Sequence, residues 1–427
     1  MIILFMLGNL PLGSSINIKG NKIEKENINE ESISLKIKEI INKINKTLIK
    51  NFLEELISIG PRMTGTYGCE NAGEYIYNKF LEFSLDAEKH KWKGFGNIWH
   101  PGYYQSENII GTLEGKNKKE TETIVFNAHY DTVEDTVGAN DDGSGVIGVL
   151  AAAYVLSQYN FNRTIKFVTF SGEEIGLLGS TNYVRDIYKN NEEILVEFNA
   201  DMIGLAKTKD EGRKIRLSYS EDTNWIIDEM EKINKSTDKF HLQISAMYPY
   251  DRYADRGGSD YYEFIKHGYE SISVWESTWD PKMHTPDDNI TNVNISYLVN
   301  TTRIIASTIA KIADQTDIPP RIKIIAPKRN NIYISDKNID LFKLQTTIVF
   351  NDIWIYTDVK KGNSPIKKVD FYYDGVHKET IENPPFVWHL NKNSVRKHKI
   401  KVVATDEIGR NSTDEIEFLY FNLLKSK

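Results

Sequence analysis

Hydrophobic and polar positions follow two different patterns along the 427-residue chain. Between about residues 47 and 316, short apolar runs alternate with stretches in which apolar residues recur every three or four positions. Short runs bounded by turn residues indicate strands, whereas the wider spacing indicates amphipathic helices. The alternation predicts an α/β domain in which a mixed, mostly parallel sheet is flanked by helices on both faces.

The predicted elements can be placed along this region. Strands are predicted over residues 108–113, 123–128, 164–170, 196–201 and 271–275. Helices are predicted over residues 48–59, 68–82, 145–158, 178–190, 224–235, 261–266 and 295–312. Open sheets of this type bind ligands beyond the carboxyl ends of their strands. We therefore expect polar residues at those ends to carry the function.

After Pro319 and Pro320 the helical spacing disappears, and residues 319–427 predict an all-β domain. Strands are predicted over residues 321–325, 346–356, 366–373, 385–390 and 398–405. Asp374-Gly375 is a strong hairpin signal. We expect an immunoglobulin-like sandwich, similar to the accessory domains of many secreted hydrolases, whose binding partner the sequence does not indicate.

The first residues of the chain resemble the apolar part of a signal sequence. Residues 1–12 (MIILFMLGNLPL) are apolar and are followed by Gly13-Ser14-Ser15. We interpret residues 1–15 as a signal-like or anchor segment and residues 16–46 as a charged lead-in; a buried strand is the alternative. The expected location is extracellular or at the cell surface, with membrane anchoring at the N-terminus left open.

Charge and cysteine content narrow the classes of function. The net charge of -7 is spread over mixed Lys and Glu without a basic cluster, so nucleic acid is not an expected partner. Cys69 is the only cysteine, which excludes an intramolecular disulfide and a thiolate metal site. A bound metal would have to use histidine and carboxylate ligands.

Candidate ligands begin directly after the predicted strand 123–128. His129 follows this strand, and Asp131 could accept the second ring N–H of a metal-bound imidazole. Asp141 and Asp142 lie in a glycine-rich turn that leads into a helix. A structural histidine, a helix cap and a calcium loop are the plain alternatives.

Further acids and a second histidine follow the later strands. Glu173 and Glu174 come after the strand that ends at residue 170; one could bind a metal while the other takes a proton from water. Asp201 ends another strand, and His284 lies in a proline-containing loop. Together with His129 and Asp141, these residues form a nitrogen and oxygen site suited to zinc or a related divalent ion.

Six motifs in this order resemble one family over roughly residues 52–312. The motifs are AHYD, GANDDGSG, SGEEIGLLGS, FNADMIG, RGGSDYYEF and HTPDDN. The chain resembles the co-catalytic di-zinc aminopeptidases, the twenty-eighth metallopeptidase family, which includes bacterial leucyl aminopeptidases and plasma glutamate carboxypeptidase. The resemblance implies the zinc-exopeptidase (phosphorylase/hydrolase-like) fold and two Zn²⁺ ions.

The resemblance also implies a role for each candidate residue. Asp141 would bridge the metals, His129 and Asp201 would complete one site, and Glu174 and His284 would complete the other. Glu173 would be the general base, and Asp131 and Asp142 would support the ligands; the Asp141-Asp142 peptide bond is similar to one that is often cis. The substrates would be peptides with a free N-terminus, from which a metal-bridged hydroxide removes N-terminal residues.

One position departs from the family pattern. Some members carry Tyr before the last histidine ligand, where this chain has Met283. Tyr248, Tyr250 and Arg256 are candidates for the missing contact to substrate, and uncommitted loop residues are the alternative.

Two other classes of function fit the same residues. The fold also supports glutaminyl cyclases and carboxypeptidase-like enzymes. A non-catalytic surface-binding protein with structural metals is the second alternative.

Overall fold

The computed structural model describes residues 34–117, 122–219, 223–246, 258–329, 331–339 and 346–423. Hydrophobic cores form within residues 37–318, and a separate core forms within residues 322–420. The predictions for residues 1–33 and for Tyr248, Tyr250 and Arg256 lie outside the described residues. None of the helices in the described ranges combines the length and the apolar character needed to cross a bilayer.

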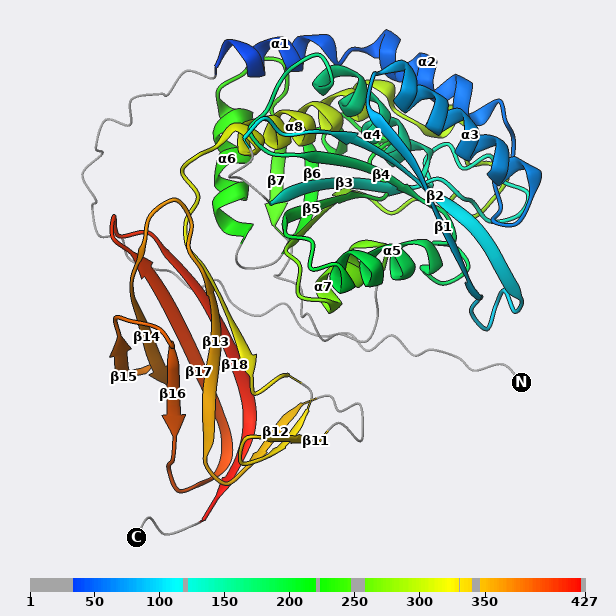
Figure 1. Ribbon diagram of the computed structural model, residues 1–427. Coiled ribbons are helices and arrows are strands. Elements are labelled where there is room, and N and C mark those ends of the chain that lie inside the picture. The colour runs from blue at the N-terminus through cyan, green and yellow to red at the C-terminus, as the bar shows by residue number, and fades with distance from the viewer. Residues whose placement is uncertain are drawn as a thin grey trace. The chain divides into compact units, whose positions relative to one another are not determined.

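An eight-stranded mixed sheet forms the centre of the first part (Figure 1). Its strands, in spatial order, are β1 (Asp86–Phe95), β2 (Tyr103–Leu113), β4 (Ile165–Phe170), β3 (Thr123–His129), β5 (Ile194–Ala200), β8 (Ser271–Glu276), β6 (Lys214–Tyr219) and β7 (Gln243–Ala246). Strands β4, β3, β5 and β8 run parallel to one another, and β2 and β6 flank them in antiparallel orientation. The predicted mixed α/β fold is confirmed.

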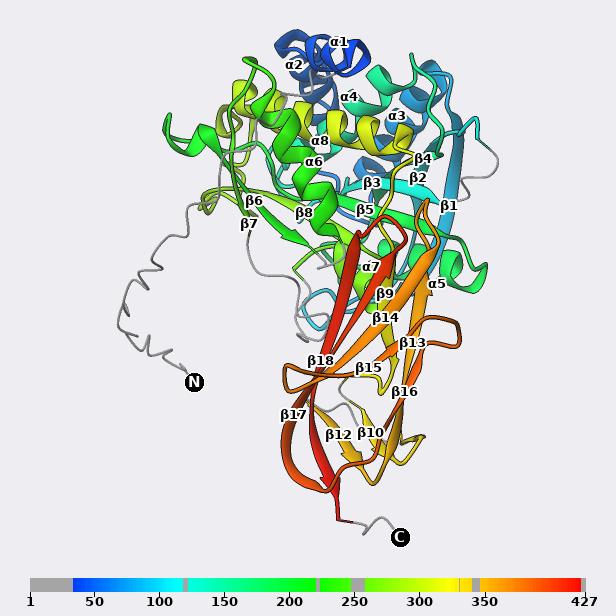
Figure 2. The same cartoon turned by 90° about the vertical axis from the view of Figure 1, so that its left-hand side faces the viewer.

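Helices cover both faces of this sheet, as two perpendicular views show (Figures 1 and 2). The helices are α1 (Leu35–Lys43), α2 (Lys46–Ile57), α3 (Tyr67–Glu82), α4 (Gly143–Leu156), α5 (Leu178–Lys189), α6 (Asn224–Lys235), α7 (Tyr261–Lys266) and α8 (Ile295–Asp314). Helices α5 and α7 lie on one face, and α2, α3, α4 and α8 lie on the other. Because α4 contacts the sheet, α2 and α8, nearly all of its side chains are buried and its sequence is apolar throughout.

In this eight-stranded sheet, the strands that the sequence did not predict lie at or next to the two edges. β1 is the last strand at one edge of the sheet, and most of its side chains are exposed or half-buried. Its sequence therefore lacks the apolar alternation of a half-buried strand. β6 and β7 are short and lie at the opposite edge.

The second part consists of two sheets around one shared core. One sheet contains β11 (Lys337–Ile339), β10 (Ile332–Ile334), β12 (Thr347–Phe350), β18 (Asn411–Asn422), β17 (Ser394–Asp406), β14 (Ile366–Tyr373) and β15 (Val376–Ile381). The other contains β16 (Val387–Leu390), β13 (Ile353–Lys360) and β9 (Arg321–Ala326). The predicted all-β region is confirmed, and its immunoglobulin-like class stays a prediction.

The β14–β15 hairpin turns at Asp374-Gly375 as predicted, with φ angles of 49° and 77°. The predicted strand 346–356 is wrong in one respect, because it is divided between β12 and β13. Asn351, between these two strands, has a φ of 67°. Asn tolerates this left-handed conformation, and the turn sends the chain from one sheet to the other.

A fully buried arginine joins the loops at the carboxyl end of β3. Arg62 Nε donates to the carbonyl of Tyr130 at 2.7 Å, and its Nη2 donates to the carbonyl of Gly138 at 3.1 Å. Its Nη1 donates to the carbonyl of Val137. Burial lowers the pKa of Arg62 to about 10, which still leaves the guanidinium charged at neutral pH. One side chain thus fixes the backbone on both sides of this turn.

Replacement of this side chain tests how strongly it stabilises the fold. Arg62→Met keeps the length of the side chain but leaves three carbonyl groups without their donor, so we expect the free energy of unfolding to fall by about 3 kcal/mol or more. Urea unfolding measures the change. Arg396→Met, at an arginine whose side chain is 74% exposed, is the matched control. Equal stability of the two variants would contradict this role.

A buried acid in β5 makes stability depend on pH. Glu197 accepts a hydrogen bond from Asn127 Nδ2 at 2.5 Å, yet its burial raises its pKa to about 8. The folded protein therefore keeps a proton that an unfolded glutamic acid loses near its usual pKa of about 4.3. Because the unfolded chain binds fewer protons in this interval, stability falls as the pH rises from about 4.3 to about 8.

We predict that Glu197→Gln weakens this pH dependence. Gln keeps the acceptor for Asn127 but has no proton to lose, so the variant should gain on the order of 1–3 kcal/mol relative to wild type between pH 5 and pH 8.5. Urea unfolding at several pH values measures this difference. Glu54→Gln on α2, where the side chain is 49% exposed, should follow the wild-type profile. A pH-independent difference between Glu197→Gln and wild type would contradict the expected titration.

Candidate metal centre

Five predicted side chains from distant parts of the sequence meet at the carboxyl ends of the parallel strands. His129 ends β3, Asp201 follows β5, and Glu174 lies in the loop between β4 and α5. Asp141 lies in the turn before α4, and His284 lies between β8 and α8. Their ligand atoms form overlapping groups in which all atoms lie within 4.8 Å of one another.

The carboxylate of Asp141 belongs to two of these groups. Its Oδ1 lies 3.3 Å from His129 Nε2, which is also 3.7 Å from Asp201 Oδ1. Its Oδ2 lies 3.1 Å from His284 Nε2, which is also 3.2 Å from Glu174 Oε2. One carboxylate thus presents one oxygen to each of two histidine-carboxylate groups.

The spacing and the donor types fit zinc. Donor atoms around a tetrahedral zinc, at bond lengths of about 2.0–2.2 Å, lie about 3.3–3.6 Å from one another. The four distances above, 3.1–3.7 Å, match that spacing. Glu174 Oε1 is buried and has no hydrogen-bond partner among the residues that the structure describes, so it is also available to a cation. A third group of possible metal-binding atoms consists of His129, Glu173 and Glu174. Glu173 is therefore also a ligand candidate.

The charges of the site are coupled in a way that favours a cation. Burial raises the pKa of Glu173 well above its usual value, and the charge of Asp201 adds to this effect. Burial would lower the pKa of His129, but Asp201 and Glu173 raise it well above its usual value. Hydrogen bonds to carboxylates, first of all to Asp141, raise the pKa of His284 to about 10. Without a metal, this concentration of buried negative charge draws protons to the site; a divalent cation could replace them.

Asp131 supports the site through a different atom from the one predicted. His129 Nδ1 lies 3.1 Å from the backbone carbonyl of Asp131 and 3.6 Å from its carboxylate. The carboxylate instead accepts the Thr64 hydroxyl at 2.9 Å and the N–H of Glu173 at 3.2 Å. Thr64 in turn accepts the N–H of Gly172 at 2.9 Å. Asp131 therefore orients the loop that carries Glu173 as well as the imidazole.

Asp142 has the capping role that was the plain alternative and also contacts His129. One carboxylate oxygen accepts the N–H of Gly145 at 2.9 Å and caps α4. The other lies 3.3 Å from the backbone N of His129. The peptide bond between Asp141 and Asp142 is cis, as the resemblance implied.

Several residues that sequence reasoning did not assign also shape the site. Asp288 accepts the N–H groups of Asn140 and Asp141, both at 2.9 Å, and so fixes the turn that presents Asp141. Asp260 is fully buried, and burial raises its pKa to about 7. Both acids lie within quoted motifs, HTPDDN and RGGSDYYEF, which is the signal that could have identified them. Arg62 stands outside every motif.

His284 differs from the other ligand candidates in exposure and backbone geometry. Its side chain is 46% exposed, whereas that of His129 is 1% exposed. Its φ of 61° lies in the left-handed region, which is uncommon for a residue with a side chain. Met283, which precedes it, offers no hydroxyl group to a substrate.

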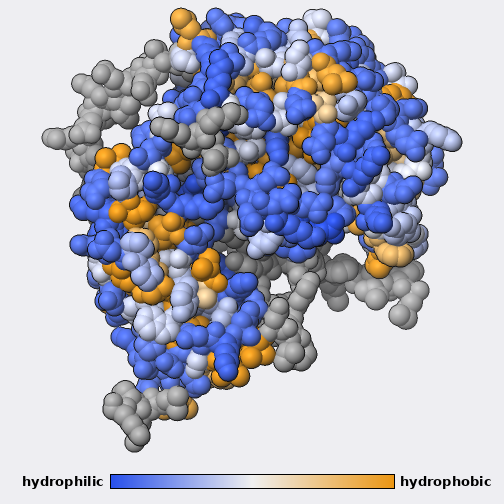
Figure 3. Space-filling model, in the orientation of Figure 1, coloured by the Kyte–Doolittle hydropathy of each residue, from blue (hydrophilic) through white to orange (hydrophobic). Residues whose placement is uncertain are grey.

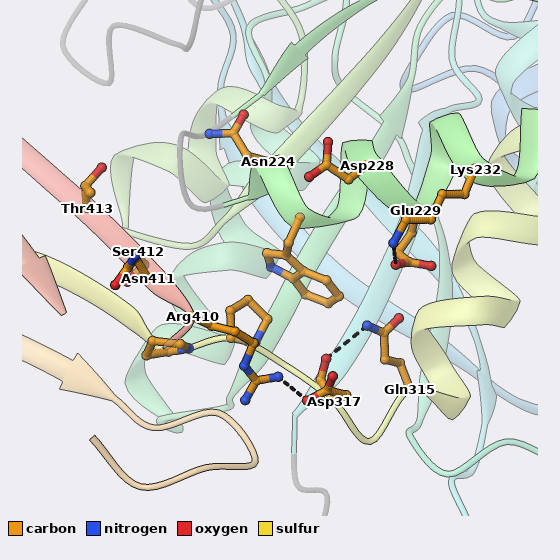
Figure 4. A pocket seen from close by; sticks show the side chains of 13 residues that line it. Asn224, Asp228, Glu229, Lys232, Gln315, Asp317, Arg410, Asn411, Ser412 and Thr413 are labelled. Atoms are coloured by element: carbon orange, nitrogen blue, oxygen red, sulfur yellow. Dashed lines mark hydrogen bonds and ion pairs between the residues drawn. The ribbon is translucent and has the colours of Figure 1, made fainter. Parts of the chain in front are cut away.

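A polar pocket elsewhere in the structure contains none of these residues (Figure 4). It is lined by α6 residues, by the segment around Asp317, and by residues 410–413 of the all-β part. Gln315 Nε2 donates to the Asp317 carbonyl at 3.0 Å, and Arg410 pairs with the Asp317 carboxylate. The lining of this pocket contains no histidine. We therefore assign the candidate chemistry to the five ligand candidates and Glu173.

Comparisons with known proteins agree with this site. The sequence profile of peptidase family M28 matches residues 108–309, which include all five ligand candidates and Glu173. Aminopeptidase YwaD of Bacillus subtilis is 29% identical over 288 residues, which are 65% of this chain and 59% of that protein. The matches cover 59% of YwaD, 41% of aminopeptidase Y of Saccharomyces cerevisiae and 51% of probable leucine aminopeptidase 2 of Aspergillus fumigatus. The chain therefore spans about half the length of these relatives.

Solved structures share the fold. LapB from Legionella pneumophila superposes with a TM-score of 0.56 at 21% identity, over 67% of this chain and 76% of that chain. A glutaminyl cyclase from Porphyromonas gingivalis gives a TM-score of 0.52 at 18% identity, over 63% of this chain and 98% of that chain. Fold similarity alone therefore does not separate a peptidase from a cyclase. Over residues 108–309 the α/β part of this chain is similar to peptidase family M28, and its curated relatives are named aminopeptidases.

Proposed function

We propose that this chain is a zinc-dependent exopeptidase that removes N-terminal residues from peptides. The observation that carries the proposal is the position of Asp141, whose two oxygens face two separate histidine-carboxylate groups. A bridging carboxylate of this kind suits a pair of cations, as found in two-metal hydrolytic sites. The aminopeptidase names of the relatives, such as YwaD and aminopeptidase Y, support the same reaction.

Two zinc ions are the proposed cofactors. His129 and Asp201 would complete one position, and Glu174 and His284 would complete the other, with Asp141 shared. Zinc, when bound, supplies a Lewis acid for the scissile carbonyl and lowers the pKa of water. The donor set contains imidazole and carboxylate groups and no thiol, which matches the ligands of catalytic zinc sites.

Glu173 is the proposed general base. The backbone N–H of Glu173 donates to the Asp131 carboxylate, and this hydrogen bond fixes the position of Glu173 relative to the ligand candidates. Its carboxylate would accept a proton from the attacking water and then give that proton to the leaving amine. Burial favours the protonated form that this second step requires.

The other functions are less well supported. A glutaminyl cyclase shares the fold, but a cyclase would use one zinc, and the shared carboxylate of Asp141 offers two positions. A non-catalytic protein with structural metals would not need an uncommitted acid beside its ligands. The carboxypeptidase-like alternative differs in which end of the peptide enters the site. An extracellular or cell-surface location stays a prediction.

We predict that Glu173→Gln abolishes most hydrolysis while zinc stays bound. Loss of a general base should lower kcat by about 10²–10⁴-fold. The assay uses zinc-loaded protein and a panel of aminoacyl amides with free and blocked amines, with zinc content measured by mass spectrometry. Glu54→Gln is the control.

Each part of this assay can contradict the proposal. Cleavage of blocked amides but not of free ones would overturn the aminopeptidase assignment. Loss of zinc from Glu173→Gln would make Glu173 a ligand, in line with the third group of side chains. Full activity of Glu173→Gln would show that Glu173 is not the general base.

We also predict that the two metal positions can be separated by mutation. His284→Ala should lower the zinc content from two ions to one per chain, because the group around His129 does not use His284. Bound zinc should raise the thermal midpoint, since a ligand at 1,000 times its Kd stabilises the fold by about 4 kcal/mol. His389→Ala in the all-β part is the control. Complete loss of zinc from His284→Ala would mean that a single shared position exists.

A further inference from the structure

We propose that the tip of the β1–β2 hairpin, residues 95–103, binds the part of a peptide substrate that follows the scissile bond and favours apolar side chains there. The inference rests on the proposed exopeptidase function and adds a preference that the metal centre alone does not provide. It is carried by the position of the tip, its attachment to the loop of Glu173 and Glu174, and its exposed side chains.

The hairpin extends beyond the sheet on the side of the metal centre. β2 pairs with β4 from Ile109 to Leu113, and antiparallel pairing places residues 103–107 beyond the carboxyl end of β4. β1 stays paired with β2 up to Phe95 and Tyr103. Figure 1 shows this hairpin projecting past the neighbouring strands. At about 3.4 Å per residue, the overhang reaches about 15–20 Å.

Two hydrogen bonds attach the hairpin to the loop that carries Glu173 and Glu174. Trp92 Nε1 donates to Ser171 Oγ at 2.9 Å, just before Glu173. The Asn97 N–H donates to the carbonyl of Ile175 at 2.8 Å, directly after Glu174. The tip is therefore fixed relative to the two glutamates.

Large apolar side chains are exposed on this tip. Phe95, Ile98, Trp99 and Tyr103 are 76%, 84%, 80% and 56% exposed. Figure 3 shows apolar surface at the end of the hairpin, on the lower right. Single exposed apolar residues are ordinary, but four on one turn form a patch that indicates an interaction.

The turn holds these side chains in a defined arrangement. The rings of Phe95 and Tyr103 meet edge to face at 5.1 Å between centroids. Asn97 Oδ1 accepts the N–H of Trp99 at 2.9 Å, and the Gly96 N–H donates to the Gly102 carbonyl at 2.9 Å. A preorganised apolar surface loses little conformational freedom when it binds a partner.

A peptide is the occupant that these observations favour. With its amine at the metal centre, an extended peptide advances about 3.3–3.6 Å per residue and reaches the attached tip within a few residues. The sequence has no Asp or Glu between Lys89 and Ser106, so the tip does not repel the terminal carboxylate of a short peptide. A bilayer around the tip would instead bring lipid against the mouth of the same site.

The test compares substrates that differ only after the scissile bond. The double variant Ile98→Ala/Trp99→Ala is assayed with a short aminoacyl amide and with two pentapeptides, one with Phe and one with Ser at the third and fourth positions. The N-terminal residue is the one best cleaved in the amide panel. We expect wild type to prefer the Phe peptide by about tenfold in kcat/KM, through KM, which corresponds to about 1.4 kcal/mol of contact. The double variant should lose this preference.

Tyr188→Ala is the matched control, because Tyr188 is an aromatic residue, 56% exposed, at the far end of α5. It should keep the preference of wild type. An unchanged ratio between the Phe and Ser peptides in the double variant would overturn the proposal. So would an equal loss on the amide and on both peptides, which would show a general disturbance of the loop.

A binding measurement separates this inference from the proposed function. Zinc-loaded Glu173→Gln is titrated with the same peptides, labelled at the C-terminus, by fluorescence anisotropy. If wild type cleaves no amide, the proposed function fails. The affinity difference between the Phe and Ser peptides still tests the inference, because it does not depend on hydrolysis. Loss of binding to phosphatidylcholine/phosphatidylglycerol vesicles in the double variant, with peptide preference unchanged, would overturn it in favour of a membrane surface.

Discussion

The carboxylate of Asp141 is the contact on which the site depends, because it faces both histidine-carboxylate groups at once. Its position is set by backbone contacts and not by its own side chain. Asp288 holds the N–H of Asp141, and Arg62 holds the carbonyl of Gly138 three residues earlier. Acids gathered at one buried place repel one another, so this geometry requires a rigid frame and a compensating positive charge.

The sheet supplies that frame. Parallel strands β4, β3 and β5 end at the same edge, which brings Glu174, His129 and Asp201 together although they are far apart in the sequence. The loop after β4 is held from several sides, by Thr64, Asp131 and the β1–β2 hairpin. A substitution in any of these supports should alter the site without touching a ligand.

The sequence predicted the parts of the fold whose patterns are strong. Helix α8 was predicted over residues 295–312 and is observed as Ile295–Asp314, because its buried face repeats at helical spacing. β1 was not predicted, because an exposed edge strand has no apolar alternation to detect. The strand divided at Asn351 was predicted as one because apolar residues lie on both sides of Asn351-Asp352, although Asn and Asp are turn residues and mark the division.

The same contrast applies to the site. Its ligand candidates could be predicted from the motifs in which they lie, and the structure brings all five together. Arg62 could not, because the sequence shows it only as a charged residue after Gly60-Pro61, and nothing local indicates that it is buried. Tyr248, Tyr250 and Arg256 stay predictions.

Because the two histidines differ in exposure, the candidate metal centre has a buried side and a solvent-exposed side. The imidazole of His129 is enclosed by protein, whereas nearly half of the His284 side chain faces solvent. If both proposed zinc positions are filled, the ion beside His129 could leave only after the surrounding loops open, whereas the ion beside His284 could exchange directly with the medium. The outer position would therefore follow the supply of free metal around the protein, and the inner one would act as a permanent part of the fold.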